Sequence, residues 1–169
     1  MARAGFAAAM GRKWSSADND GIIGMGPVAA HEYMCRKLGV SVSRETLETE
    51  IVGRLLALYE SGIPAIPGAV ELVDECARSV KVGIASSGSE QVVNAVLQGL
   101  RIRPLLRAVV CGGDVGRGKP APDIYIEACR RLGVDPSKAV AVEDSTAGVL
   151  SAASAGLRVV ATAGSGYAN

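Results

Sequence analysis

The chain has 169 residues, of which 49% are hydrophobic and only 4% aromatic, so it can bury a sizeable core of small aliphatic side chains. Its formal net charge is +1 and no basic run stands out, which argues against a surface that binds nucleic acid by neutralising phosphates. No apolar run approaches the roughly 18 residues of a membrane span. We therefore expect neither nucleic acid nor membrane as a partner.

Cysteine usage and the N-terminus bear on the compartment. His31 is the only histidine and no Cys-x-x-Cys pair exists, so a zinc site is not expected. The thiols are interpreted as reduced and mostly buried, and we expect a cytoplasmic protein. Residues 1–14 are interpreted as an amphipathic helix, although a basic, alanine-rich start leaves organellar targeting open. The cysteines are Cys35, Cys76, Cys111 and Cys129.

Residues 1–66 carry apolar residues at helical spacing and no strand-like run. Helix-start signals occur at Ser15–Asp18, at Pro27 and at Ser43. The segment Ile63–Gly68 is rich in proline and glycine and is typical of a hinge. The sequence thus predicts an all-helical domain over residues 1–66.

After Pro67 short apolar runs alternate with helical segments, which predicts an α/β domain over residues 67–169. Such alternation favours a parallel sheet with right-handed crossovers. The expected strands cover 80–85, 108–111, 139–142 and 157–161.

Two adjacent carboxylates, Glu143 and Asp144, follow the third expected strand and precede a helix start at Ser145 and Thr146. In open α/β sheets, ligands bind at the carboxyl ends of the strands. Carboxylate oxygens there suit a hard cation such as Mg²⁺, held directly or through water. A pair of solvated loop acids that partly cap the helix is the alternative interpretation.

Ser86 follows the first expected strand directly, and Lys119 follows the second after a loop. The hydroxyl of Ser86 and the next backbone N–H groups, at Ser87 and Gly88, would bind phosphate oxygens at a helix N-terminus. Lys119 would neutralise phosphate charge. An ordinary helix N-cap and a solvated loop lysine are the alternatives. Because parallel strands end at one edge, these residues and the acid pair predict a site for phosphate and metal.

Three segments resemble motifs of the haloacid dehalogenase superfamily, specifically the β-phosphoglucomutase-like phosphatases with a helical cap. They are GIASSGS at 83–89, GRGKPAPDIY at 116–125 and VAVEDSTAGVLSAASAG at 140–156. The resemblance extends over residues 67–162, and residues 2–66 resemble the four-helix cap of that family. It implies a Rossmannoid parallel sheet flanked by helices, with a separate all-helical cap.

The resemblance also implies an activity, the Mg²⁺-dependent hydrolysis of a small phosphorylated metabolite. It implies that Ser86 is the phosphate ligand of the second motif and Lys119 the lysine of the third, both at the catalytic centre. It implies that Glu143 and Asp144 are the Mg²⁺ acids of the fourth motif. A monomer is expected for the full-length parent.

One family motif has no counterpart at the expected place. The family attacks phosphate with an aspartate from a DxDG motif on a central first strand, through an aspartyl-phosphate. We expect this chain to begin inside the cap and to lack that strand, which would leave an interior gap with unpaired backbone groups. Asp18–Gly21 spells DNDG, but no apolar strand precedes it, so we interpret it as a helix start within the cap.

We therefore expect an enzyme as the parent and no activity from the 169 residues alone. Two alternatives stay open. One is a non-catalytic binding or structural derivative that kept the fold without the nucleophile. The other is a sugar phosphomutase, which is disfavoured because Met25–Pro27 occupies the place of a phosphate-binding arginine in the mutase cap.

Overall fold

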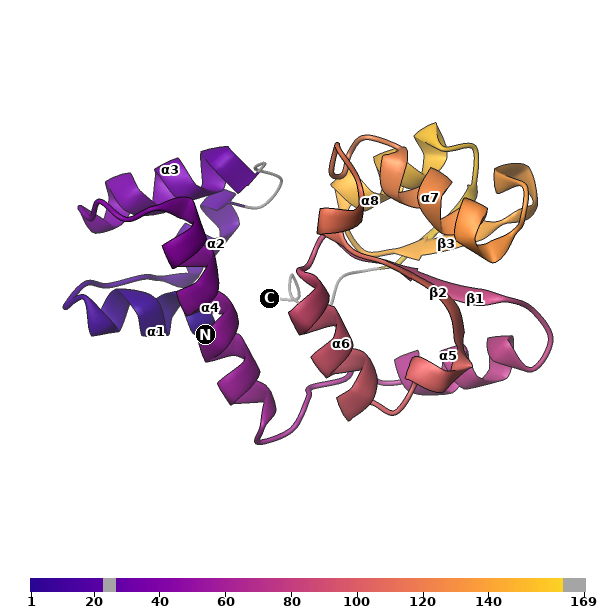
Figure 1. The fold of residues 1–169 in the computed structure, drawn as a ribbon, viewed down its shortest axis with the longest axis horizontal. Coiled ribbons are helices and arrows are strands. Elements are labelled where there is room, and N and C mark those ends of the chain that lie inside the picture. Colours follow the sequence, from indigo (N-terminus) through magenta and orange to yellow (C-terminus); the bar gives the residue numbers. More distant parts are fainter. Residues whose placement is uncertain (23–26, 163–169) are drawn as a thin grey trace. The chain divides into compact units, whose positions relative to one another are not determined.

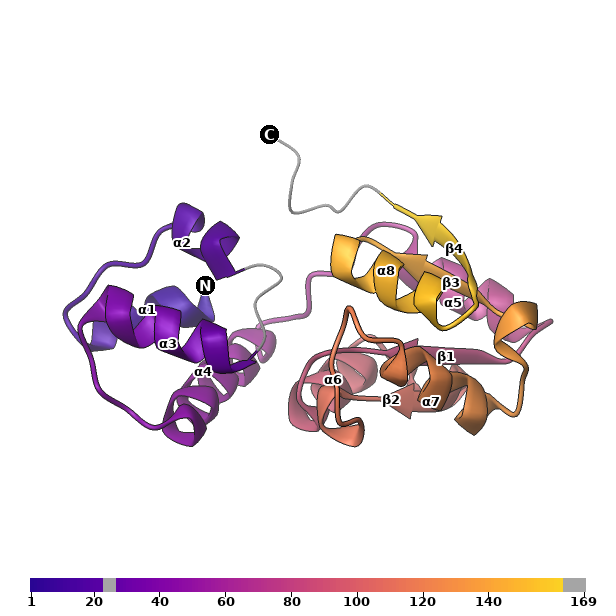
Figure 2. The ribbon, with the colours of Figure 1, turned by 90° about the horizontal axis from the view of Figure 1, so that it is seen from above.

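The computed structural model describes residues 1–22 and 27–162. It divides the chain into two compact units, Met1–Gly62 and Ile63–Asn169, so the boundary falls at the start of the predicted hinge. Each unit has its own hydrophobic core. Figures 1 and 2 show the elements of each unit from two directions.

The unit Met1–Gly62 is helical throughout its described residues, as predicted. A serine or glycine marks several helix ends: the Oγ of Ser43 accepts a hydrogen bond of 3.1 Å from the N–H of Thr46, and Gly39 has a φ of 63° directly after a helix. Glycine adopts this left-handed conformation without steric cost. The core includes Phe6 and Leu38. The helices are α1 (Ala2–Ala9), α2 (Ser16–Ile22), α3 (Pro27–Leu38) and α4 (Arg44–Tyr59).

The DNDG segment lies in α2, which confirms the helix-start interpretation for Asp18. Its carboxylate accepts a hydrogen bond of 2.8 Å from the N–H of Ser15 and forms an ion pair of 2.9 Å with the ammonium of Lys37. These two contacts lower the pKa of Asp18 to about 2. The side chain of Asp20 and residues 23–26, which include Gly24 and Met25, lie outside the described part of the chain.

The unit Ile63–Asn169 alternates helices and strands, and every strand and helix predicted in it is found, with ends shifted by a few residues. Most apolar strand residues pack against helices in two clusters, one around Val110 and Ile124 and the other around Leu97 and Leu106. The elements are α5 (Ala69–Ala77), β1 (Val82–Ala85), α6 (Glu90–Gly99), β2 (Leu106–Val110), α7 (Asp123–Leu132), β3 (Val140–Glu143), α8 (Thr146–Ser154) and β4 (Arg158–Ala161).

The strands are parallel, as predicted, but the described residues form two pairs instead of one continuous ladder. Strand β1 pairs with β2, with Ala85 opposite Val110. Strand β3 pairs with β4, with Glu143 opposite Ala161. Neither β1 nor β3 has a second strand partner within residues 1–22 and 27–162. Strands β1 and β3 therefore each present an edge whose ladder groups are not paired with another described strand.

A cavity of about 1010 Å³ separates the two pairs, and every residue of β1 and of β3 contributes to its wall. Helix α7 packs against both strands of the first pair and also against α8, which covers the second pair. On β3 the side chains of Val140 and Val142 are about half exposed. The helices thus hold the two pairs in one unit without any hydrogen bond between β1 and β3 (Figure 2).

Two further features bear on the sequence predictions. In the described part of the chain, no helix combines the length and the hydrophobicity that crossing a lipid bilayer demands. All four cysteines are free thiols, as predicted, with Cys111 and Cys129 buried and the other two half-buried.

Candidate active site at the carboxyl ends of the strands

The loop between β2 and α7 carries Lys119 and is held on both sides of it. Arg117 donates two hydrogen bonds to the carboxylate of Asp123, at 3.1 and 2.9 Å. The fully buried hydroxyl of Ser151, on α8, donates a hydrogen bond of 2.6 Å to the carbonyl of Ala121. These contacts restrict the loop, so the direction in which Lys119 extends is set by the fold.

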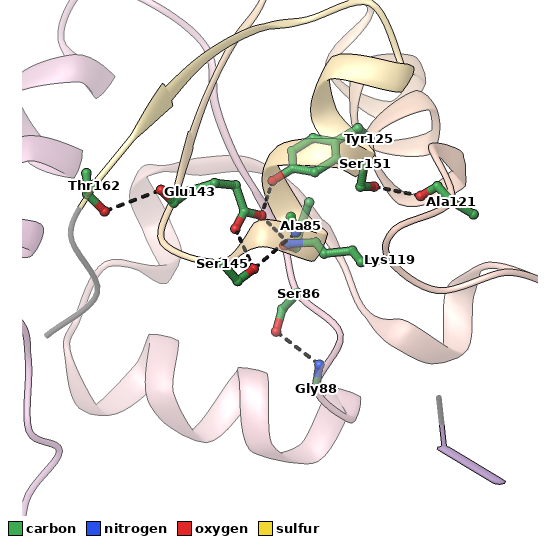
Figure 3. A network of polar contacts seen from close by, with 11 residues as sticks. Ala85, Ser86, Gly88, Lys119, Ala121, Tyr125, Glu143, Ser145, Ser151 and Thr162 are labelled. Carbon is green, nitrogen blue, oxygen red and sulfur yellow. Dashed lines mark hydrogen bonds and ion pairs between the residues drawn. The ribbon is translucent and has the colours of Figure 1, made fainter. Parts of the chain in front are cut away.

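The side chain of Lys119 is only 12% exposed. Its ammonium donates a hydrogen bond of 3.1 Å to the carbonyl of Ala85 and forms an ion pair with Glu143 (Figure 3). Ala85 is the last residue of β1 and Glu143 the last of β3, so one cation joins the carboxyl ends of the two strand pairs. Lys119 is therefore not a solvated loop lysine, and that alternative interpretation is wrong.

The carboxylate of Glu143 is buried, with 7% of the residue exposed. Its Oε1 accepts from Lys119 and from the hydroxyl of Tyr125, and its Oε2 accepts from the hydroxyl of Ser145 at 3.3 Å. Burial raises the pKa of Glu143, but the hydrogen bonds from Lys119 and Tyr125 outweigh burial, so its pKa lies below the ordinary value. Glu143 is thus a buried anion whose oxygens are largely occupied by protein donors.

The neighbouring carboxylate of Asp144 is exposed, and it accepts no hydrogen bond from any residue that the structure describes. No group of three histidine, cysteine or acidic side chains converges in the described ranges. Mg²⁺ binds through oxygen ligands, usually keeps several waters and needs only one or two carboxylates from the protein. Asp144 is therefore suited to bind Mg²⁺ directly, and Glu143 is suited to contact the ion through a bound water.

Ser86 lies directly after β1, and its N–H donates a hydrogen bond of 2.9 Å to Val110 in the neighbouring strand. Its Oγ accepts a hydrogen bond of 3.1 Å from the N–H of Gly88. The residue that caps α6 is Ser89, whose Oγ accepts from the N–H of Val92. The interpretation of Ser86 as an ordinary helix N-cap is therefore wrong.

The structure brings most of the predicted site residues to one place. The walls of the cavity between β1 and β3 include Ser86, Ser87, Lys119, Glu143 and Asp144. Gly88 is absent from these walls, and its N–H is already bonded to Ser86. A hydroxyl, a cation and two carboxylates at one edge can bind an anion together with a metal ion.

Three residues of this arrangement were not predicted as part of the site: Tyr125, Ser145 and Gly148. Ser145 caps α8, where its Oγ accepts a hydrogen bond from Gly148, and it also donates to Glu143. Gly148 allows the carboxylate to approach the helix, since a β-carbon there would collide with it. The helix-start signal at Ser145 was visible in the sequence, whereas the contacts of Tyr125 and Gly148 depend on packing between distant segments.

Known proteins resemble this chain in sequence and in fold. A family model described as haloacid dehalogenase-like hydrolase matches residues 3–156. Protein CbbY of Rhodobacter capsulatus is 36% identical over 114 residues, which cover 64% of this chain and 50% of that protein. Hexitol phosphatase B of Escherichia coli K12 is 30% identical over 119 residues, covering 70% of this chain and 54% of that protein. The matches thus span about half the length of these two relatives.

Among solved structures, CbbY from Rhodobacter sphaeroides in complex with phosphate is similar, with a TM-score of 0.83 and 27% sequence identity. The similarity covers 98% of this chain and 78% of that chain. The fold, a helical unit joined to a parallel α/β unit, is therefore shared with a structure that binds phosphate. Because the family model covers most of the sequence, the chain belongs to the haloacid dehalogenase-like hydrolases.

Proposed function

We propose that this chain forms the phosphate- and Mg²⁺-binding part of an enzyme that hydrolyses a small phosphate monoester. The observation that carries the proposal is the position of Lys119, whose largely buried ammonium lies at the carboxyl ends of β1 and β3. A positive charge that is held in place before the substrate arrives stabilises the charge of a transferring phosphoryl group.

The residues around Lys119 have complementary roles in this proposal. The hydroxyl of Ser86 accepts from the N–H of Gly88, so its own proton stays available to a phosphate oxygen. Ser87 is an exposed residue whose N–H donates to no group in the described part of the chain, so this N–H supplies a second donor. Gly88 is not assigned as a phosphate ligand, because its N–H is engaged by Ser86.

Asp144 would hold the Mg²⁺ ion directly, and Glu143 would contribute through water, because protein donors already occupy most of the sites on its oxygens. When bound, Mg²⁺ neutralises charge on phosphate oxygens and acts as a Lewis acid. The chain's own contribution is to present the exposed carboxylate of Asp144 beside the N-terminus of α8 (Thr146–Ser154). Glu143 stays ionised through its contact with Lys119.

The nucleophile is not among the described site residues. The hydroxyl of Ser86 contacts only the N–H of Gly88 there, so no general base is placed to remove its proton. We infer that hydrolysis proceeds through an aspartyl-phosphate on a carboxylate that these site residues do not supply. A non-catalytic derivative that binds phosphate without hydrolysing it is the alternative, and the absence of a nucleophile among the described site residues fits it as well.

The direct test is phosphate binding by the chain, measured by isothermal titration calorimetry with inorganic phosphate, with and without Mg²⁺. We expect binding that strengthens when Mg²⁺ is present, and a loss on the order of tenfold or more in the Lys119→Ala variant. Lys13→Ala, which removes an exposed lysine from the helical unit, is the matched control and should bind as the unsubstituted chain does. Equal phosphate affinity in all three proteins would contradict the proposed site.

A further inference from the structure

The phenol of Tyr125 contacts both members of the buried ion pair. Tyr125 lies on α7 (Asp123–Leu132) and is 7% exposed. Its hydroxyl donates to Oε1 of Glu143, the same oxygen that accepts from Lys119, and the ammonium of Lys119 lies 5.1 Å from the centre of its ring (Figure 3). One side chain therefore touches the anion through its hydroxyl and lies within cation–π range of the cation.

These contacts fix the orientation of the Glu143 carboxylate. An ionised carboxylate offers about four lone-pair sites, two on each oxygen. Lys119 and Tyr125 occupy both sites on Oε1, whereas Oε2 lies against Gly148 of α8 and accepts, among the described residues, only from Ser145, at 3.3 Å. Without the phenol hydroxyl, Oε1 would have one donor fewer and the carboxylate could rotate. A carboxylate whose rotation is fixed is what an ion or its bound water requires.

The phenol is also a donor that persists at neutral pH. Burial and the nearby carboxylate of Glu143 both raise the pKa of Tyr125, so its hydroxyl keeps its proton. Tyr125 lines the cavity as an uncharged group, and its ring is packed in the core cluster that contains Ile124 and Val110. Its hydroxyl therefore acts on the site only through Glu143 and Lys119.

We propose that Tyr125 is a positioning residue, which fixes the rotation of the Glu143 carboxylate at the cation site beside Asp144. The inference rests on the proposed function, since it assigns Tyr125 a role at the same Mg²⁺ site. It goes beyond that function because it makes metal affinity depend on a hydroxyl that contacts no metal ligand other than Glu143.

The test compares Mg²⁺ affinity in four versions of the 169-residue chain by isothermal titration calorimetry: unsubstituted, Tyr125→Phe, Glu143→Gln and the double variant. Tyr125→Phe keeps the ring and removes only the hydroxyl. We expect Tyr125→Phe to weaken Mg²⁺ binding on the order of tenfold, as is usual when an outer-shell partner is removed. In the Glu143→Gln background the same change should have less than about a twofold effect, because the group it positions is altered.

Tyr59→Phe is the matched control, since Tyr59 is a half-buried tyrosine in the helical unit, and it should leave Mg²⁺ affinity unchanged. A hydroxyl that only supports the fold would weaken binding equally in both backgrounds, and that result would overturn the proposal. An affinity of Tyr125→Phe within about twofold of the unsubstituted chain would also overturn it.

A second measurement tests the contact without metal. A phenol proton held by a buried carboxylate exchanges slowly with water and should give a downfield proton resonance. That resonance should persist in Tyr59→Phe and disappear in Tyr125→Phe, and its absence from the unsubstituted protein would overturn the proposal. If the unsubstituted chain bound no Mg²⁺, the metal would no longer be part of the proposed function. The resonance would then test, without any metal, whether the Tyr125 hydroxyl holds the carboxylate of Glu143.

Discussion

Gly148 and Glu143 are matched in size: the carboxylate of Glu143 occupies the space where any other residue at position 148 would place its β-carbon. The glycine lies in the first turns of α8 and its N–H donates to the Oγ of Ser145. The side chain of Glu143 can therefore lie against the helix while Lys119 and Tyr125 hold its other oxygen.

Gly148→Ala should destabilise the protein although alanine has the higher helix propensity. The new methyl group would displace the carboxylate of Glu143 and disturb its pairing with Lys119, and overpacking of this kind costs about 1–3 kcal/mol. Urea unfolding followed by circular dichroism measures the change. Gly53→Ala is the control, because position 53 is also helical and has open space around it. That variant should be up to about 1 kcal/mol more stable, and a stabilised Gly148→Ala would contradict the packing of Glu143 against Gly148.

Lys119→Met should be strongly destabilising because it leaves the buried carboxylate of Glu143 without its cation. Removal of one partner from a buried pair typically costs about 3–5 kcal/mol, and the lysine is only 12% exposed. The double variant Lys119→Met/Glu143→Gln removes both charges and should recover part of the loss. Equal stability of Lys119→Met and the unsubstituted chain in urea would show that the ion pair does not persist in solution.

Much of this site could be predicted from the order of apolar runs and polar residues. Because parallel strands end at a common edge, Ser86, Lys119 and Glu143 could be assigned to one place although tens of residues separate them in the chain. The choice of N-cap could not be made, since the serine-rich turn after β1 offers several candidates and only the structure shows that Ser89 caps α6.

The strand pairing and the role of Tyr125 were beyond prediction for a different reason. Periodicity identifies strands one at a time, but hydrogen bonds between strands join distant segments, as in the pairing of Ala85 with Val110. Tyr125 belongs to a helix with the expected apolar spacing, and nothing in that spacing tells a core ring from one whose hydroxyl meets a carboxylate. Such contacts arise from the packing of α7 against β1 and α8.

Asp144→Asn should weaken Mg²⁺ binding, since it removes the negative charge from the exposed carboxylate of the site. In a full-length protein, turnover of a generic phosphate ester should fall together with the affinity for the metal. Calorimetry with Mg²⁺ measures the first effect and a phosphate-release assay the second. Asp74→Asn, on the exposed surface of α5, serves as the control. If the Mg²⁺ affinity and the turnover of Asp144→Asn stay within about twofold of those of the unsubstituted protein, a difference of a few tenths of a kcal/mol, Asp144 is not a ligand.

The stability of the helical unit should depend on acid pH through Asp18. Its pKa is lowered to about 2, first by the N–H of Ser15 and then by Lys37. Because the folded-state pKa lies below the unfolded value, the stabilisation is complete above about pH 5 and is lost as the pH falls from there towards 2. The difference in unfolding free energy between the unsubstituted chain and Asp18→Asn should therefore shrink over this range.

The Lys37→Met variant separates the two causes of the lowered pKa of Asp18. The hydrogen bond from the backbone of Ser15 is the larger cause and Lys37 the smaller. The variant should retain most of the pH dependence that Asp18→Asn removes. Urea unfolding at several pH values between about 6 and 2.5 measures the stability of both variants over the range in which Asp18 takes up its proton. A difference between the unsubstituted chain and Asp18→Asn that stays constant down to the lowest pH would contradict the paired carboxylate.

The 169-residue chain should not hydrolyse phosphate esters, although it carries groups that can bind phosphate and metal. None of those groups is placed as a nucleophile: the hydroxyl of Ser86 contacts only the N–H of Gly88 among the described residues. Binding without a nucleophile leaves only electrostatic assistance to attack by water, which is slow. Asp18, from the DNDG segment, is already engaged by Ser15 and Lys37.

An assay with Mg²⁺ and an activated aryl phosphate tests this expectation on the purified chain and on its Asp18→Asn and Asp20→Asn variants. All three proteins should release phosphate at the rate of the uncatalysed reaction, and a known family phosphatase in the same buffer confirms that the assay responds. Robust turnover by the unsubstituted chain that both substitutions abolish would reverse the interpretation. The DNDG segment would then supply the nucleophile, and the capping contact between Ser15 and Asp18 would have to open during catalysis.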